Sequence, residues 1–144
     1  MIAICMEPSK LGKAILVDTS AFVALHNRSD SLHARAAAVA RRYASDPAVH
    51  ITSNYILAET VTMLSQRASH SIAVDFYERA QTDLLVMPVT PAIEASAFAI
   101  FKSLRSKNVS FVDCTSFALM REFHLHIVFT FDKDFKKQGF QLLT

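Results

Sequence analysis

Short apolar runs alternate with segments of helical periodicity along the whole sequence. The apolar runs predict strands at residues 14–17, 49–52, 84–89, 127–131 and 140–143. The segments between them predict helices at residues 19–27, 31–45, 54–64, 71–81, 91–104 and 110–123. Strands that alternate with helices predict a parallel sheet. Because the runs are apolar throughout rather than at every second residue, both faces of that sheet are expected to be covered.

The fold class predicted from this pattern is α/β, with a mainly parallel central sheet of four to five strands. The chain has 144 residues and is 51% hydrophobic, which is enough to bury one core and is close to the usual size of one domain. We expect an N-terminal extension at residues 1–13 and a single domain at residues 14–144.

Composition excludes several classes of protein. Glycine occurs only twice, so neither a phosphate-binding glycine loop nor a dinucleotide fingerprint can be written in this sequence. Two cysteines make no disulfide framework, and Cys114 reads as a small core residue. No signal peptide or run of membrane-spanning length is visible, so we expect a cytoplasmic protein without membrane contact. The net charge of +2 neither indicates nor forbids nucleic acid.

Four acidic residues stand in apolar surroundings. They are Asp18 in ILVDTSAFVAL, Glu59 in YILAETVTML, Asp113 in SFVDCTSFALM and Asp132 in IVFTFDKDF. An ionised carboxylate in such company is costly unless a positive group meets it, and the first three have no lysine or arginine nearby in sequence. A cation bound from solution would supply the missing positive charge.

The positions of the four acids favour a single site. Asp18 and Asp132 end predicted strands, Glu59 lies in the helix after a strand, and Asp113 lies in the first turn of a helix. Ligands of open parallel sheets bind outside the carboxyl ends of the strands, where these acids are able to converge. Oxygen ligands without histidine or thiolate suit Mg²⁺ or Mn²⁺ rather than zinc, and the natural chemistry is phosphodiester hydrolysis.

Each acid also has a structural interpretation. Asp18 or Thr19 is able to cap the following helix, and Ser110 to Asp113 fits a capping box. Glu59 in the middle of a helix is most often a solvated residue, and Asp132 is able to start a turn. The case for a site rests on all four acids together.

Basic residues have two interpretations as well. Lys133 and Lys136 follow Asp132, and Arg28 lies just beyond the first helix. They are either solvated charges or a rim of phosphate contacts around an acidic centre. The two lysines are the stronger candidates for such contacts because they directly follow the proposed site in sequence.

The quoted motifs resemble those of PIN-domain ribonucleases, most of all the VapC toxins of VapBC toxin–antitoxin pairs. VDTSA resembles the opening motif, and LAET, FVDCTSFALM and TFDKDF follow in the order of the other three acids. The resemblance implies a three-layer α/β/α sandwich, Mg²⁺ or Mn²⁺, an RNA substrate, endonuclease action, a homodimer and a small antitoxin partner. Ser20 and Thr130 match hydroxyl positions that hold the acids or water. Both Asp132 and Asp134 suit the last acidic position; we favour Asp132 as primary and Asp134 as auxiliary.

Two other functions remain in competition with the ribonuclease. One is a non-catalytic binding module with a PIN-like fold, which the small net charge and the apolar composition allow. The other is a phosphohydrolase that acts on small phosphoesters. Such an enzyme would need two acids close together at the end of the first strand. Here Thr19 and Ser20 follow Asp18 instead.

Overall fold

Five short strands form one sheet in which every neighbouring pair is parallel. The computed structural model describes residues 13–143, and the predicted extension therefore lies almost wholly outside the described residues. The strands are β1 (Ile15–Val17), β2 (His50–Ser53), β3 (Leu85–Met87), β4 (Ile127–Phe129) and β5 (Gln141–Leu143). Each overlaps a predicted strand, so the prediction of a mainly parallel sheet of four to five strands is confirmed.

Seven helices accompany the sheet within the described residues. They are α2 (Thr19–His26), α3 (His33–Tyr43), α4 (Asn54–Arg67), α5 (His70–Asp83), α6 (Pro91–Leu104), α7 (Phe111–Glu122) and α8 (Asp134–Lys137). The first six overlap predicted helices. The prediction missed α8, because the segment after Asp132 reads as a turn and four residues are too few to show helical periodicity.

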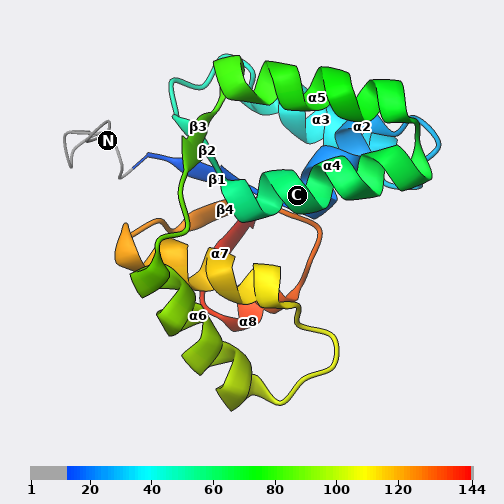
Figure 1. Ribbon diagram of the computed structural model, residues 1–144. Helices are drawn as coiled ribbons and strands as arrows, with labels where there is room; N and C mark the ends of the chain where they lie inside the picture. Colours follow the sequence, from blue (N-terminus) through cyan, green and yellow to red (C-terminus); the bar gives the residue numbers. More distant parts are fainter. Residues whose placement is uncertain (1–12, 144) are drawn as a thin grey trace.

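The strand order explains the three layers. The sheet runs β3-β2-β1-β4-β5, so the chain moves outward from β1 to β3 and then returns to the other side of β1. Crossovers between parallel strands are right-handed, and reversing the direction of travel therefore moves the helices to the opposite face. Figure 1 shows α2 to α5 on one side of the sheet and α6 to α8 on the other.

Side-chain caps fix where the helices begin. Ser53, Ser69, Thr90 and Ser110 each accept a hydrogen bond from a backbone N–H in the first turn of the following helix. Helix α7 is the most deeply inserted, with every residue from 114 to 120 buried, Cys114 among them. No helix in the described part of the chain is long and apolar enough to cross a membrane.

The reversal of strand order defines a crevice. Strands β1 and β4 are neighbours in the sheet but are separated by most of the chain, and Leu16 pairs with Val128 at their centre. Their carboxyl ends form the switch point of the sheet, which is where ligands of open parallel sheets bind. Asp18 follows β1 at this edge and Thr130 follows β4.

Candidate active site

Asp18 is a buried carboxylate at the carboxyl end of β1. Its side chain is only 3% exposed, and it caps α2 through a 3.4 Å hydrogen bond from the backbone N–H of Ser20 to Oδ2. The same oxygen accepts hydrogen bonds from Ser20 Oγ at 3.0 Å and from Thr130 Oγ1 at 2.9 Å. Burial raises the pKa of Asp18, and these hydrogen bonds oppose that rise. The capping interpretation of Asp18 is therefore correct, but capping engages only one of its oxygens.

The hydroxyls of Ser20 and Thr130 join the ends of β1 and β4. Their oxygens lie 3.0 Å apart. Ser20 Oγ also accepts a hydrogen bond from the Phe131 backbone N–H, and Thr130 Oγ1 accepts one from the Asp132 backbone N–H, both at 3.0 Å. Both residues were predicted as auxiliary, and the structure brings both to Asp18. They lock the side chain of Asp18 and the backbone before Asp132 into one network.

Glu59 reaches the same edge from α4. Thr19 Oγ1 donates a 2.6 Å hydrogen bond to Glu59 Oε2, which joins the start of α2 to the second turn of α4. Glu59 is half-buried, and burial together with the charge of Asp113 raises its pKa. Sequence reasoning considered Thr19 only as a helix cap and missed its contact with Glu59. The one signal for it in the sequence was a hydroxyl residue directly after Asp18, in a largely apolar stretch.

Asp113 closes a capping box at the start of α7. Its Oδ2 accepts a 2.7 Å hydrogen bond from the Ser110 backbone N–H, and Ser110 Oγ accepts one of 3.0 Å in return. The predicted capping box is confirmed. Burial first, and then the nearby charges of Asp18 and Asp132, raise the pKa of Asp113 to about 6. Asp113 therefore lies within electrostatic reach of both strand-end acids.

Asp132 and Asp134 have different surroundings. Asp132 Oδ1 accepts a 2.8 Å hydrogen bond from the backbone N–H of Asp134, which is the predicted turn. Asp134 Oδ1 forms a 2.6 Å ion pair with Lys137. Asp134 is therefore neutralised by its own helix, whereas Asp132 has no cationic partner among the described residues.

The four acids share one pattern. In each, one carboxylate oxygen accepts a hydrogen bond, and the other accepts none from the described residues. None of the four pairs with a lysine or arginine in the same part of the chain. The free oxygens are hard donors of the kind that Mg²⁺ and Mn²⁺ prefer, so the donor set fits such an ion. Across residues 13–143, however, no three acidic, histidine or cysteine side chains lie close enough together to hold a metal as they stand.

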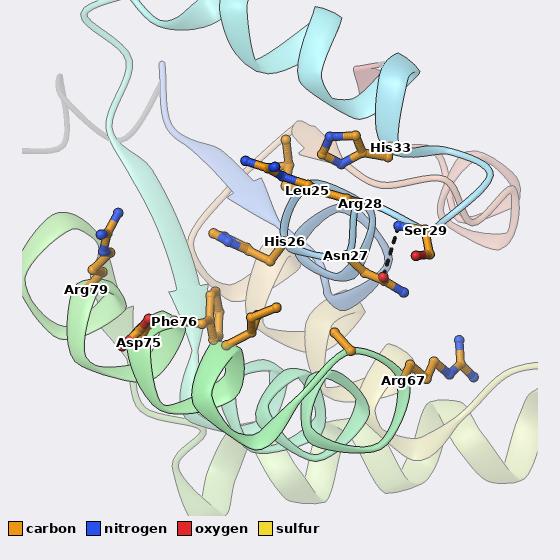
Figure 2. Close-up of a pocket in the computed structure, with 12 residues that line it drawn as sticks. Leu25, His26, Asn27, Arg28, Ser29, His33, Arg67, Asp75, Phe76 and Arg79 are labelled. Carbon is orange, nitrogen blue, oxygen red and sulfur yellow. Dashed lines mark hydrogen bonds between the residues drawn. The ribbon is translucent and has the colours of Figure 1, made fainter.

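The predicted basic residues separate into two places. Lys133 and Lys136 follow Asp132 closely in the chain and line a cavity of about 750 Å³, whose lining within residues 13–143 includes none of the four acids. Arg28 instead lines a cavity of about 770 Å³ at the opposite end of α2 from Asp18, together with Arg67 and Arg79. Figure 2 shows these arginines around that second cavity, with Arg67 and Arg79 on opposite sides of it. The two lysines therefore stay close to Asp132 along the chain, whereas α2 separates Arg28 from Asp18.

Comparison with known proteins identifies the family. The model of the PIN domain matches residues 15–141, which is nearly the whole chain. The chain belongs to the PIN-domain family. This PIN domain is also 40% identical over 127 residues to the 23S rRNA-specific endonuclease VapC20 of Mycobacterium tuberculosis, covering 88% of this chain and 95% of that protein.

Solved structures agree with the assignment. The crystal structure of M. tuberculosis VapC20, a sarcin–ricin loop cleaving toxin, matches this PIN domain with a TM-score of 0.80 at 39% identity. That match covers 89% of this chain and 97% of the other. The DNA-bound VapBC complex from Salmonella typhimurium matches with a TM-score of 0.65 at 14% identity, over 90% of this chain and 96% of that one, a likeness of fold alone. The predicted PIN-like α/β/α sandwich and the resemblance to VapC toxins are confirmed.

Proposed function

We propose that this protein is a divalent-metal-dependent endoribonuclease and the toxin of a toxin–antitoxin pair. The observation that carries the proposal is the shared pattern of Asp18, Glu59, Asp113 and Asp132, each with one oxygen held and one free. The similarity to VapC20 over 95% of that protein supports RNA as the substrate. Large-subunit ribosomal RNA is therefore the first substrate to test. An RNA substrate of this kind also supports a cytoplasmic location.

The protein's own groups prepare the proposed site. Ser20 and Thr130 hold Asp18, and Thr19 holds Glu59, so each free oxygen has a fixed direction. We assign Asp132 as the fourth acid and Asp134 as auxiliary, because Lys137 already neutralises Asp134. When bound, a Mg²⁺ or Mn²⁺ ion would offset the charge of the scissile phosphate and polarise the attacking water. Lys133 and Lys136 would meet neighbouring RNA phosphates.

The first experiment measures Mn²⁺ binding by isothermal titration calorimetry. It compares wild type with Asp18→Asn and Asp113→Asn, which keep a hydrogen-bond acceptor but lose the charge. The matched control is Glu122→Gln, an exposed acid at the other end of α7. We expect heat from wild type and the control and none from the two aspartate variants.

The second experiment measures cleavage of ribosomal RNA with Mg²⁺ or Mn²⁺ and with excess chelator. Cleavage that requires the metal and disappears in Asp18→Asn is the expected result. Full cleavage in chelator, or in Asp18→Asn, would contradict the proposal. A protein that binds no metal and cuts no RNA would instead be a PIN-like binding module.

We also propose that the protein forms a homodimer through the exposed face of α6. Phe98 and Phe101 on that face are 53% and 42% exposed, and Phe101 packs edge-on against Phe111 at the start of α7. Large exposed aromatic side chains on a small domain are typical of interaction surfaces. Light scattering should give the mass of a dimer for wild type and of a monomer for Phe98→Glu.

An antitoxin is the second proposed protein partner. The resemblance to VapC toxins supports it, since those proteins are paired with a small inhibitor. Expression of this protein alone should arrest bacterial growth, and co-expression of a small protein that binds it should restore growth. The same arrest in the Asp18→Asn variant would separate toxicity from cleavage and contradict the proposal.

A further inference from the structure

One cavity, lined in part by the segment after β4, holds a combination of basic and aromatic side chains that the proposed cleavage does not require. It measures about 750 Å³ and lies between α3, the segment after β4 and the edge strand β5. Its basic lining includes Arg35, Lys133 and Lys136, and its apolar lining includes Phe131 and Phe140. The described residues that line the cavity include none of the four acids, but Phe131 and Lys133 are the two chain neighbours of Asp132. The Phe131 backbone N–H also donates to the Ser20 hydroxyl that holds Asp18.

The positive charges of this cavity are available to a ligand. Lys137 also lines it, but that lysine is paired with Asp134 at 2.6 Å. Arg35, Lys133 and Lys136 are exposed and have no ion pair within residues 13–143. Three such cations in one cavity, two of them within four residues of Asp132 in the chain, are suited to hold phosphate groups.

The cavity also contains an arginine–aromatic pair. The guanidinium carbon of Arg35 lies 5.5 Å from the centre of the Phe131 ring. Phe131 is half-buried, its ring packs edge-on against Phe129 at 6.0 Å, and its backbone N–H donates to Ser20 Oγ. Phe131 is therefore held by its neighbours, with the guanidinium of Arg35 beside its ring. Aromatic rings and guanidinium planes are the surfaces on which unpaired RNA bases stack.

We propose that this cavity is a nucleotide subsite, in which an unpaired base next to the cleaved bond stacks on Arg35 and Phe131. Lys133 and Lys136 contact the phosphates that flank this base. The inference rests on the proposed ribonuclease function and adds how the enzyme selects its position on RNA. An unpaired nucleotide explains the aromatic ring, the guanidinium and the free lysines together, whereas an acidic peptide would explain only the charges.

The test measures binding of a fluorescent RNA hairpin with an unpaired loop, by anisotropy and in chelator so that no cleavage occurs. The variants are Arg35→Gln and Phe131→Leu. The control is Arg42→Gln, because Arg42 lies on the same helix about two turns away and forms a similar pair with Tyr43 at 5.6 Å. We expect about a 10-fold weaker Kd for the two variants and little change for the control.

Removal of single bases from the loop separates stacking from a general loss of charge. In wild type, one abasic position should weaken binding by about 10-fold. In Phe131→Leu the same abasic position should have no further effect, whereas Phe131→Tyr should behave as wild type. A folding defect in Phe131→Leu would weaken binding at every position equally and would not remove the effect of one base.

Three results would overturn the subsite. The first is that Arg35→Gln and Arg42→Gln bind the hairpin with equal affinity. The second is that the variants lose as much affinity for a fully paired duplex as for the hairpin loop. The third is that the variants lose affinity for an acidic peptide but not for the RNA. Cleavage of RNA by wild type is measured separately. Failure of the subsite with intact cleavage leaves the proposed function standing, and absence of metal-dependent cleavage removes that function whatever the binding shows.

Discussion

Thr19 Oγ1 lies 2.6 Å from Glu59 Oε2, although the two residues are 40 positions apart in the chain. Thr19 begins α2 directly after Asp18, and Glu59 belongs to α4. One hydrogen bond therefore sets the direction of Glu59 relative to Asp18.

Thr19→Val should lower metal-dependent RNA cleavage by about 10-fold, because it frees Glu59 from the group that orients it. The free energy of unfolding should fall by only about 1 kcal/mol. Thr19→Ser keeps the hydroxyl and should retain activity. Thr62→Val is the control on α4, since Thr62 is exposed and donates only to the Ala58 carbonyl. Equal activity in Thr19→Val and wild type would remove Thr19 from the site.

Thr130→Val should damage both stability and activity. Thr130 is fully buried, donates to Asp18 and accepts from the Asp132 backbone N–H. With valine, the Asp18 carboxylate and the Asp132 backbone N–H each lose one hydrogen bond, and the free energy of unfolding should fall by about 1–3 kcal/mol. Urea denaturation checks the stability. If the hydroxyl acts through Asp18, the effects of Thr130→Val and Asp18→Asn on cleavage should not add.

The metal-free protein should lose stability as pH rises from about 4 to above 6. The pKa of Asp113 is raised to about 6 from 3.8, mainly by burial, so the folded state holds a proton that the unfolded state releases. Its contribution is complete below the unfolded pKa and is lost as pH rises through the folded one. We expect a difference on the order of 1 kcal/mol after solvent screening.

Thermal unfolding with and without Mn²⁺ checks this pH dependence. Asp113→Asn should flatten the profile, because asparagine does not titrate and still accepts from the Ser110 backbone. Mn²⁺ should raise the Tm of wild type at neutral pH and leave that of Asp113→Asn unchanged. A wild-type profile identical to that of the variant would show that Asp113 titrates alike in both states.

Thr60→Val should stabilise the protein by about 1 kcal/mol. Thr60 is fully buried, and its hydroxyl has no hydrogen-bond partner within the described part of the chain. Valine has the same shape and removes the unpaired polar group. Thr60→Ser keeps the hydroxyl, loses a methyl group and should be less stable than wild type. Both values come from urea denaturation, and a less stable Thr60→Val would reveal a partner for the hydroxyl.

Most of the fold was predictable from the sequence, because each helix or strand has a local cause. Continuous apolar runs mark strands that are buried on both faces, and Ser110 with Asp113 marks the start of α7 by a local capping box. The one-turn helix α8 was missed for lack of periodicity. The strand order was not predictable, since it depends on contacts between β1 and β4 that no local pattern encodes.

The site was predictable as a set of residue types and not as a geometry. The acids stood out because apolar neighbours make them costly, but the contact between Thr19 and Glu59 joins distant segments. Arg28 was grouped with the lysines as a candidate RNA contact on its position after the first helix. In the structure α2 carries it to another cavity, because eight helical residues rise about 12 Å.

The hydrogen bond on one oxygen of each acid has a consequence for the thermodynamics of ion capture. Fixing a free carboxylate side chain costs rotamer entropy, up to about 2 kcal/mol for the longest chains. In this protein Asp18, Glu59, Asp113 and Asp132 lose that freedom when the chain folds, before any ion arrives. Capture of the ion then orders few side chains, and its entropy should be dominated by water released from the ion and from the carboxylates.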